Sequence, residues 1–170
     1  MIISVSFRLA VIPSKGAISM SEWSNKEIAR LKELMATKRV KDEKSVQDYN
    51  TKQAKGLGFW ESTKSAAKRL VDEINEKVSS DLILWDSEKY EVFRITATGF
   101  KPNTYVTATY NEKAFSLKYT QPPHNSSTEL NLFAEDDGQV FWQDKSGHNN
   151  LTAERGAELI VGALTTALKV

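Results

Sequence analysis

Residues 81–144 carry the feature that most constrains the fold, because apolar and polar residues alternate there in short runs separated by turn residues. Phe93, Ile95 and Ala97, for example, alternate with Arg94 and Thr96. Successive side chains of a β-strand point to opposite faces of its sheet, so each run predicts a strand with one apolar face. Such strands must pack their apolar faces against other elements, since each strand alone would leave its apolar side in water.

The turn signals lie close together, at residues 99–103, 111–113, 121–127 and 136–138. Short connections join neighbouring antiparallel strands, and the Asp137-Gly138 pair is a strong hairpin signal. The sequence therefore predicts an α+β fold. We expect a five- to six-stranded antiparallel β-meander with one face covered by helices, in the order N-terminal helices, sheet, C-terminal helix.

Apolar residues recur at helical spacing on both sides of this stretch. The pattern predicts helices over residues 25–37, 60–78 and 152–168. The last helix should lie on the sheet antiparallel to the one over 60–78. Gly156 and Gly162 within it indicate close approach to a neighbouring backbone.

The segment between the first two helices, residues 38–58, is polar. We expect a mobile linker there, with a short helix starting after Ser45. Gly56 and Gly58 are interpreted as a flexible break before the next helix, since Gly is unfavourable inside helices. The pair is not a phosphate-binding loop, because no strand precedes it and no third Gly follows.

The domain organisation follows from these elements. Residues 1–20 are expected to be a leader or a disordered segment, and residues 21–170 a single α+β domain. That domain would comprise a basic helical half (21–80), an antiparallel sheet (81–144) and the C-terminal helix (152–168). Arg8 interrupts the apolar start, which makes residues 1–19 a poor signal peptide without excluding secretion.

Charge is distributed unevenly, although the formal net charge is only +1. Residues 25–79 contain 13 Lys and Arg against 9 Asp and Glu, whereas residues 81–170 contain 8 against 12. The halves could attract each other across the fold, or the basic half could meet an anionic partner. No apolar run approaches the ~20 residues that span a bilayer, so we expect no membrane partner and a cytoplasmic protein.

Residues that could support catalysis or metal binding are few. The chain has no Cys, which excludes disulfides and thiolate metal sites, and its two His, His124 and His148, fall in expected loops. A pair of His148 with Asp144 lacks a positioned nucleophile. The acidic turn 135–138 lacks the alternating ligands of a calcium loop. We therefore expect no metal and no cofactor, and the sequence favours a binding protein over an enzyme while leaving that choice open.

Aromatic residues crowd the predicted sheet and suggest a binding surface. Phe141 and Trp142 are adjacent and must point to opposite faces, so one of them would join Tyr105 and Phe133 on the uncovered face. We expect a binding or scaffold domain that uses this aromatic face, or a pocket between sheet and helices, for a protein or small ligand. Curling of the sheet or formation of a homodimer could instead bury these rings.

An alternative function is nucleic-acid binding by the basic N-terminal helices. The candidate phosphate contacts are Lys38, Arg39, Lys64, Lys68 and Arg69. Such side chains supply the electrostatic part of binding to nucleic acids. The same segment holds nine acidic residues, so its excess of positive charge is modest.

Overall fold

The computed structural model describes residues 20–100, 104–122, 126–147 and 149–168. The elements in chain order are α1 (Met20–Val78), β1 (Ile83–Lys89), β2 (Val92–Ala97), β3 (Thr104–Asn111), β4 (Ser116–Gln121), β5 (Ser126–Ala134), β6 (Val140–Gln143), β7 (Asn150–Leu151) and α2 (Ala153–Ala167). The chain divides into two units, Met1–Glu43 and Lys44–Val170. The sheet, α2 and the second part of α1 belong to the second unit.

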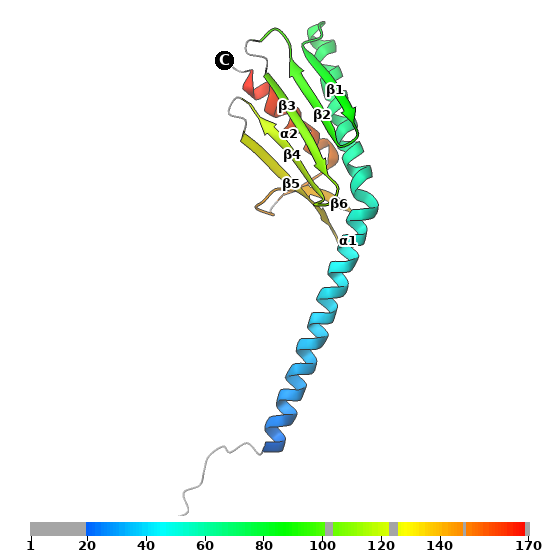
Figure 1. Cartoon of the computed structure of the whole chain (residues 1–170), viewed down its shortest axis with the longest axis vertical. Helices are drawn as coiled ribbons and strands as arrows, with labels where there is room; N and C mark the ends of the chain where they lie inside the picture. The colour runs from blue at the N-terminus through cyan, green and yellow to red at the C-terminus, as the bar shows by residue number, and fades with distance from the viewer. Residues whose placement is uncertain (1–19, 101–103, 123–125, 148, 169–170) are drawn as a thin grey trace, which may run out of the picture. The chain divides into compact units, whose positions relative to one another are not determined.

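The strands form one seven-stranded antiparallel sheet in the order β1-β2-β3-β4-β5-β6-β7 (Figure 1). The predicted α+β class and antiparallel meander are confirmed, with a strand count slightly above the five or six expected. The alternation assigns the faces correctly. Ile95 in β2 is paired with Val106 in β3, and both are fully buried, whereas Arg94 and Tyr105 beside them are exposed.

Helix α1 is continuous over 59 residues, so the predicted mobile linker over 38–58 and the break at Gly56 and Gly58 are wrong. No Pro occurs between residues 14 and 101, and residues 38–58 include five Lys, one Arg and two Gln, which are good helix formers. Each Gly costs about 1 kcal/mol against Ala, a penalty that neighbouring turns can absorb. Gly56 is also buried against the sheet, where only a residue without a side chain fits.

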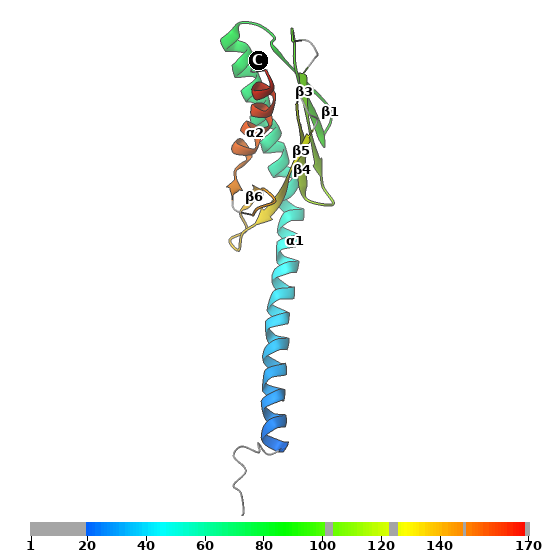
Figure 2. The same cartoon turned by 90° about the vertical axis from the view of Figure 1, so that its left-hand side faces the viewer.

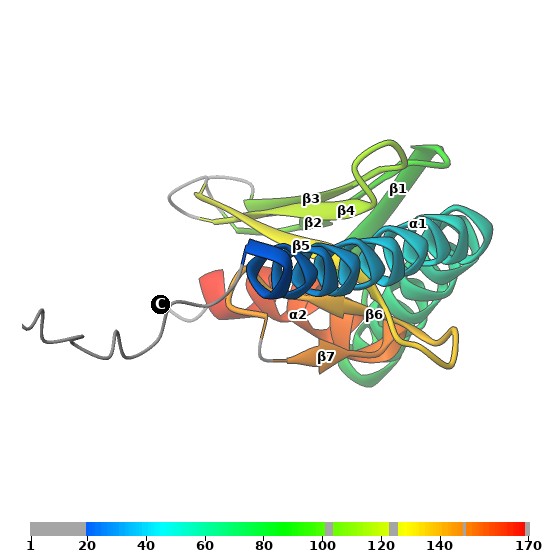
Figure 3. The same ribbon diagram turned by 90° about the horizontal axis from the view of Figure 1, so that it is seen from below.

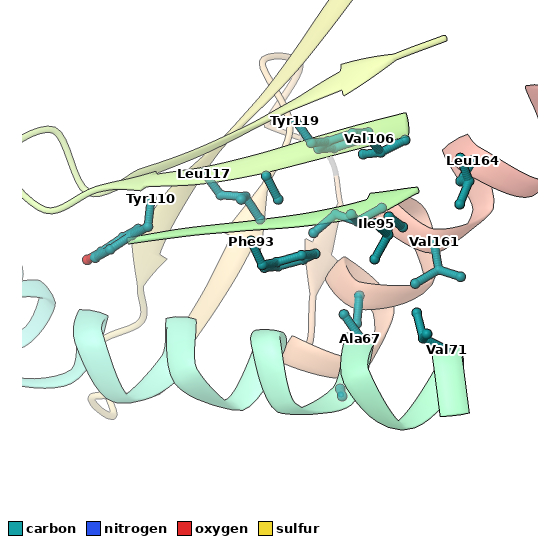
Figure 4. Close-up of a cluster of buried hydrophobic side chains, with 14 of the residues drawn as sticks. Ala67, Val71, Phe93, Ile95, Val106, Tyr110, Leu117, Tyr119, Val161 and Leu164 are labelled. Atoms are coloured by element: carbon teal, nitrogen blue, oxygen red, sulfur yellow. The ribbon is translucent and has the colours of Figure 1, made fainter. Parts of the chain in front are cut away.

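Both helices cover the same face of the sheet within the second unit. Figure 4 shows Val71 of α1 and Val161 of α2 pointing into one apolar cluster with Phe93 and Ile95 of β2. Trp60 of α1 is fully buried and stacks on Phe93, with ring centroids 5.6 Å apart. Apolar burial of this kind is the dominant favourable term in folding, so this cluster positions both helices.

Helix α2 runs in the same direction as the part of α1 that lies on the sheet, and the expected antiparallel arrangement is therefore wrong (Figures 1 and 2). The reason is the strand count. The chain reverses at every connection, and with seven strands between the helices the number of reversals is even, which restores the original direction. Six strands would have given the opposite direction. The additional strand is β7, which has only two residues.

The sheet curls as it approaches its far edge. Figure 3 shows β7 on the other side of α2 from β2 and β3. Gly156 of α2 lies against the ring of Trp142 in β6, since a Cβ built on this glycine would be 2.7 Å from Trp142 Cδ1. The close approach expected at Gly156 is thus present, made by a side chain rather than a backbone. No helix in the described part of the chain is long and apolar enough to cross a membrane.

Candidate functional site

A groove lies between α2 and the end of β4, with a volume of about 420 Å³. Pro122 and the ring of Tyr119 form one wall, and Leu159 and Ala163 of α2 form much of the other. Its volume falls within the range of about 300–1,000 Å³ that is typical of ligand sites, while the groove is open to solvent and its lining is about as polar as it is apolar. This groove is the candidate for the pocket that the sequence analysis expected between sheet and helices.

Gly162 explains why the groove is open. It belongs to the lining, and a Cβ built on it would meet no heavy atom within 4 Å. The close backbone approach expected at this glycine is therefore absent. A larger residue would project into the groove without a clash, so Gly162 keeps the space empty.

The groove also has polar lining residues. Glu158 and Thr166 are both exposed and line it from α2. The Glu158 carboxylate is paired with Arg155, one turn earlier in the helix. The groove thus combines an apolar centre with a carboxylate and a hydroxyl that could orient a ligand.

The uncovered face of the sheet is less aromatic than predicted. Tyr105 is exposed there, but its ring lies under the guanidinium of Arg94, with Arg94 Cζ 5.0 Å from the ring centroid. Arg94 Nε also donates to Thr107 Oγ1 over 3.2 Å. The surface around Tyr105 is therefore polar, and Arg94 covers part of its ring.

The predicted aromatic surface residues do not gather in one place. Tyr105 is near the start of β3 and Phe133 near the end of β5, and these two strands run in the same direction. The registers through β4 place them roughly 25 Å apart along the strands. Phe133 instead pairs with Phe141 of β6, which is half-buried.

Trp142 is excluded from the uncovered face because it is completely buried. Its ring packs against Phe59, with centroids 5.4 Å apart, and its Nε1 donates to Thr63 Oγ1 over 2.9 Å. Alternation required one of Phe141 and Trp142 to face inward, and Trp142 is that residue. Curling of the sheet around α2 encloses it.

The five basic residues proposed as phosphate contacts do not form one free patch. Lys38 and Arg39 are exposed on the part of α1 in the first unit. In the second unit, Lys64 Nζ lies 3.4 Å from the carbonyl oxygens of Lys89 and Tyr90 and can donate to them, and Lys68 is paired with Asp72. Arg69 is exposed. Two of the three candidate phosphate contacts in the second unit are therefore already engaged.

The acidic turn after β5 is held by contacts within the second unit. Asp136 forms an ion pair with Lys44 of α1 at 2.8 Å, and Lys55 Nζ donates to the carbonyl of Gly138 over 2.7 Å. Asp137 accepts from the backbone and side chain of Gln139. Among the residues that the structure describes, no group of three or more His, Asp or Glu could hold a metal ion.

Asp144 accepts several hydrogen bonds in the loop after β6. Ser146 donates its backbone N–H over 3.0 Å as well as its hydroxyl, and the backbone of Gly147 donates over 3.0 Å. The Ser146 hydroxyl is the main cause that holds the pKa of Asp144 below its ordinary value. The pair of Asp144 with His148 is not tested, because His148, like His124, lies outside the described residues.

Comparison with other proteins gives no relative, since no protein-family model, curated protein or solved structure matches this chain.

Proposed function

We propose that this protein is a non-enzymatic binding domain whose recognition site is the groove between α2 and the end of β4. The observation that supports this function best is the opening left by Gly162 among the apolar side chains of Leu159, Ala163 and Pro122. A small apolar group, from a protein side chain or a free molecule, would fit this space. Its burial would supply most of the affinity.

The polar residues narrow the class of ligand. Glu158 offers carboxylate oxygens, and its partner Arg155 is exposed, so a ligand that donates a hydrogen bond could share this carboxylate. Thr166 offers a hydroxyl that donates or accepts. We therefore propose an apolar or aromatic group that carries a hydrogen-bond donor.

The groove is a better candidate than the uncovered sheet face. That face separates Tyr105 from Phe133 and covers Tyr105 with Arg94, so the two rings do not form one aromatic patch. Nucleic-acid binding has weaker support than the groove, because Lys64 and Lys68 have partners within the second unit.

NMR titration of the ¹⁵N-labelled full chain with indole and p-cresol tests the proposal. Both probes are aromatic and donate a hydrogen bond. We expect saturable shifts at backbone amides of residues 119 and 158–166. Gly162→Leu should fill the groove and abolish these shifts, while raising helix propensity by up to about 1 kcal/mol.

Gly58→Leu is the matched control. Gly58 lies in α1, and a Cβ there also meets no heavy atom within 4 Å, so the substitution changes propensity without touching the groove. This variant should bind both probes like the unaltered protein. Absence of saturable shifts in that protein, or equal binding by the Gly162→Leu variant, would contradict the proposed site.

A further inference from the structure

The first unit carries an apolar face that nothing in the described part of that unit covers. Five large apolar side chains of α1 are between 48% and 72% exposed, namely Trp23, Ile28, Leu31, Leu34 and Met35. At about 100° per residue they lie within roughly 140° of the helix circumference. We call them the outer stripe. Contiguous exposed apolar surface of this kind marks an interaction site.

Two charged residues lie at equal distances from the Leu31–Leu34 pair, Glu27 within the outer stripe and Lys38 three residues beyond its end. Glu27 precedes Leu31 by four residues, and Lys38 follows Leu34 by four residues. Both fall within the same arc of the helix as the apolar side chains. Glu27 accepts from Arg30 over 3.1 Å, a pair exposed enough to contribute little stability. An acid therefore precedes the point midway between Leu31 and Leu34, and a base follows that point at the same distance along the helix.

We infer that the outer stripe binds a second copy of this chain in antiparallel orientation, about a two-fold axis between Leu31 and Leu34. Leu31 of one copy then faces Leu34 of the other, and Ile28 lies near Met35. Glu27 faces Lys38 twice, once on each side of the axis. The opposite charges face each other on both sides of the Leu31–Leu34 contacts, so the pattern is self-complementary.

The charge pattern selects this arrangement over a parallel one. A parallel pair in register would place Glu27 against Glu27 and Lys38 against Lys38, and like charges across an interface are destabilising. The antiparallel pair replaces both repulsions with attractions between opposite charges. The orientation therefore follows from the positions of these two residues relative to Leu31 and Leu34.

A lipid surface fits the outer stripe less well than a second copy does. Helices that bind anionic membranes have a polar face rich in Lys and Arg. Residues 20–43 contain six Lys and Arg and five Asp and Glu, so attraction to anionic lipid is nearly cancelled. Glu27 would also bring a carboxylate into the apolar layer, at a cost in free energy.

Sedimentation equilibrium of the full chain tests the dimer. The stripe is small for a stable interface, so we expect a dimer dissociation constant on the order of 10 μM. Leu31→Glu should weaken association at least tenfold. Val40→Glu is the matched control, because Val40 is 65% exposed on the opposite side of α1, about 180° from Leu31, and should leave the dimer unchanged.

Charge reversal tests the orientation. Glu27→Lys alone and Lys38→Glu alone each place like charges opposite each other in the antiparallel pair, so each variant should self-associate at least tenfold more weakly. In a parallel pair, by contrast, each substitution would only exchange one like-charge contact for another and leave the affinity nearly unchanged.

An equimolar mixture of the two charge-reversal variants tests whether the charges meet across the interface. One variant then carries a base at both positions and the other an acid at both. Every contact between the two chains at these positions joins opposite charges, so the mixture should regain a wild-type dissociation constant. Circular dichroism of each variant checks that the fold is retained.

Four results would overturn this inference. The first is a wild-type chain that stays monomeric at several hundred micromolar. A monomeric chain that binds vesicles of anionic phospholipid would overturn the inference in the same way. The second is a Val40→Glu variant whose dimer is weakened as much as that of the Leu31→Glu variant. The third is a charge-reversal variant that self-associates as tightly as the wild type, and the fourth is a mixture that associates no better than either variant alone.

Discussion

Asn75 of α1 hydrogen-bonds both backbone groups of Ile83 in β1. Asn75 Nδ2 donates to the Ile83 carbonyl oxygen over 2.8 Å, and Asn75 Oδ1 accepts from the Ile83 N–H over 2.9 Å. Since β1 is an edge strand, these groups of Ile83 have no neighbouring strand. The side-chain amide takes the place of a strand at this point and attaches the end of α1 to the sheet. Covering an edge in this way limits pairing with other chains.

Asn75→Ala should destabilise the second unit by about 1–3 kcal/mol, because it leaves two backbone groups of Ile83 without their partners. Urea unfolding followed by circular dichroism measures this change. Asn50→Ala is the control, since Asn50 is exposed in the same helix, and its effect should stay within about 0.5 kcal/mol. Equal effects of the two substitutions would show that the Asn75 contacts contribute nothing to stability.

Gly56→Ala should destabilise the fold by about 1–3 kcal/mol, whereas Gly58→Ala should stabilise it by up to about 1 kcal/mol. A Cβ on Gly56 would be 2.6 Å from the Tyr110 hydroxyl, and one on Gly58 would meet open space. Thermal or urea unfolding of the two variants compares them directly. Equal stabilisation by both substitutions would contradict the close contact between Gly56 and Tyr110.

Tyr110→Phe should partly rescue Gly56→Ala, because it removes the hydroxyl that the new methyl group meets. The Tyr110 hydroxyl is buried without a hydrogen-bond partner among the described residues, and burial raises the pKa of Tyr110. Its removal alone should therefore cost little or increase stability. A double-mutant cycle on unfolding free energies measures the rescue, and strictly additive effects would contradict it.

Thr63→Val should cost about 1–3 kcal/mol despite its matched shape. It removes the hydroxyl that accepts the indole N–H of Trp142, and this N–H would remain buried without a partner. Thr63→Ser keeps the hydroxyl and should retain the hydrogen bond. The indole N–H resonance of Trp142 should move in the Val variant and stay close to its position in the Ser variant. The opposite order would argue against this hydrogen bond.

The loop at Asp144 should lose order in acid. The hydroxyl of Ser146 lowers the pKa of Asp144 in the folded chain, so the contacts of this carboxylate favour folding above its unfolded pKa of about 3.9. That contribution is lost as pH falls through the lower, folded pKa. Ser146→Ala should move the pKa of Asp144 upward, as measured by ¹³C NMR titration of its carboxyl group. Ser127→Ala, in β5, serves as the control and should leave the pKa unchanged.

The sheet was predictable because apolar residues recur at every second position along its strands, and one face of the sheet is buried. The alternation around Ile95 and Val106 assigns the inward residues without knowledge of the partner strands. Strand β7 has two residues, too few to show a period, so it was missed. Since five or six strands were expected, the number of chain reversals, and with it the direction of α2, could not be derived from the sequence.

Elements that depend on contacts distant in sequence were not predictable in the same way. Gly56 resembles a helix break locally, and only the approach of Tyr110, 54 residues later in the chain, shows why a glycine is tolerated in the helix there. The alternation of side chains along a strand showed that Phe141 and Trp142 point to opposite faces, but it did not show which of the two is buried. The groove was expected only in general terms, because the space beside Gly162 depends on where Pro122 and Leu159 meet in the folded chain.

The shared direction of α1 and α2 has an electrostatic consequence. Both helices end at the same end of the second unit, so the carbonyl termini at Val78 and Ala167 place two regions of partial negative charge there (Figure 2). Lys77 in the last turn of α1 offsets one of them, while the last turn of α2 has no basic residue. The two partial negative charges repel each other, and raising the salt concentration should ease that repulsion between the helix termini.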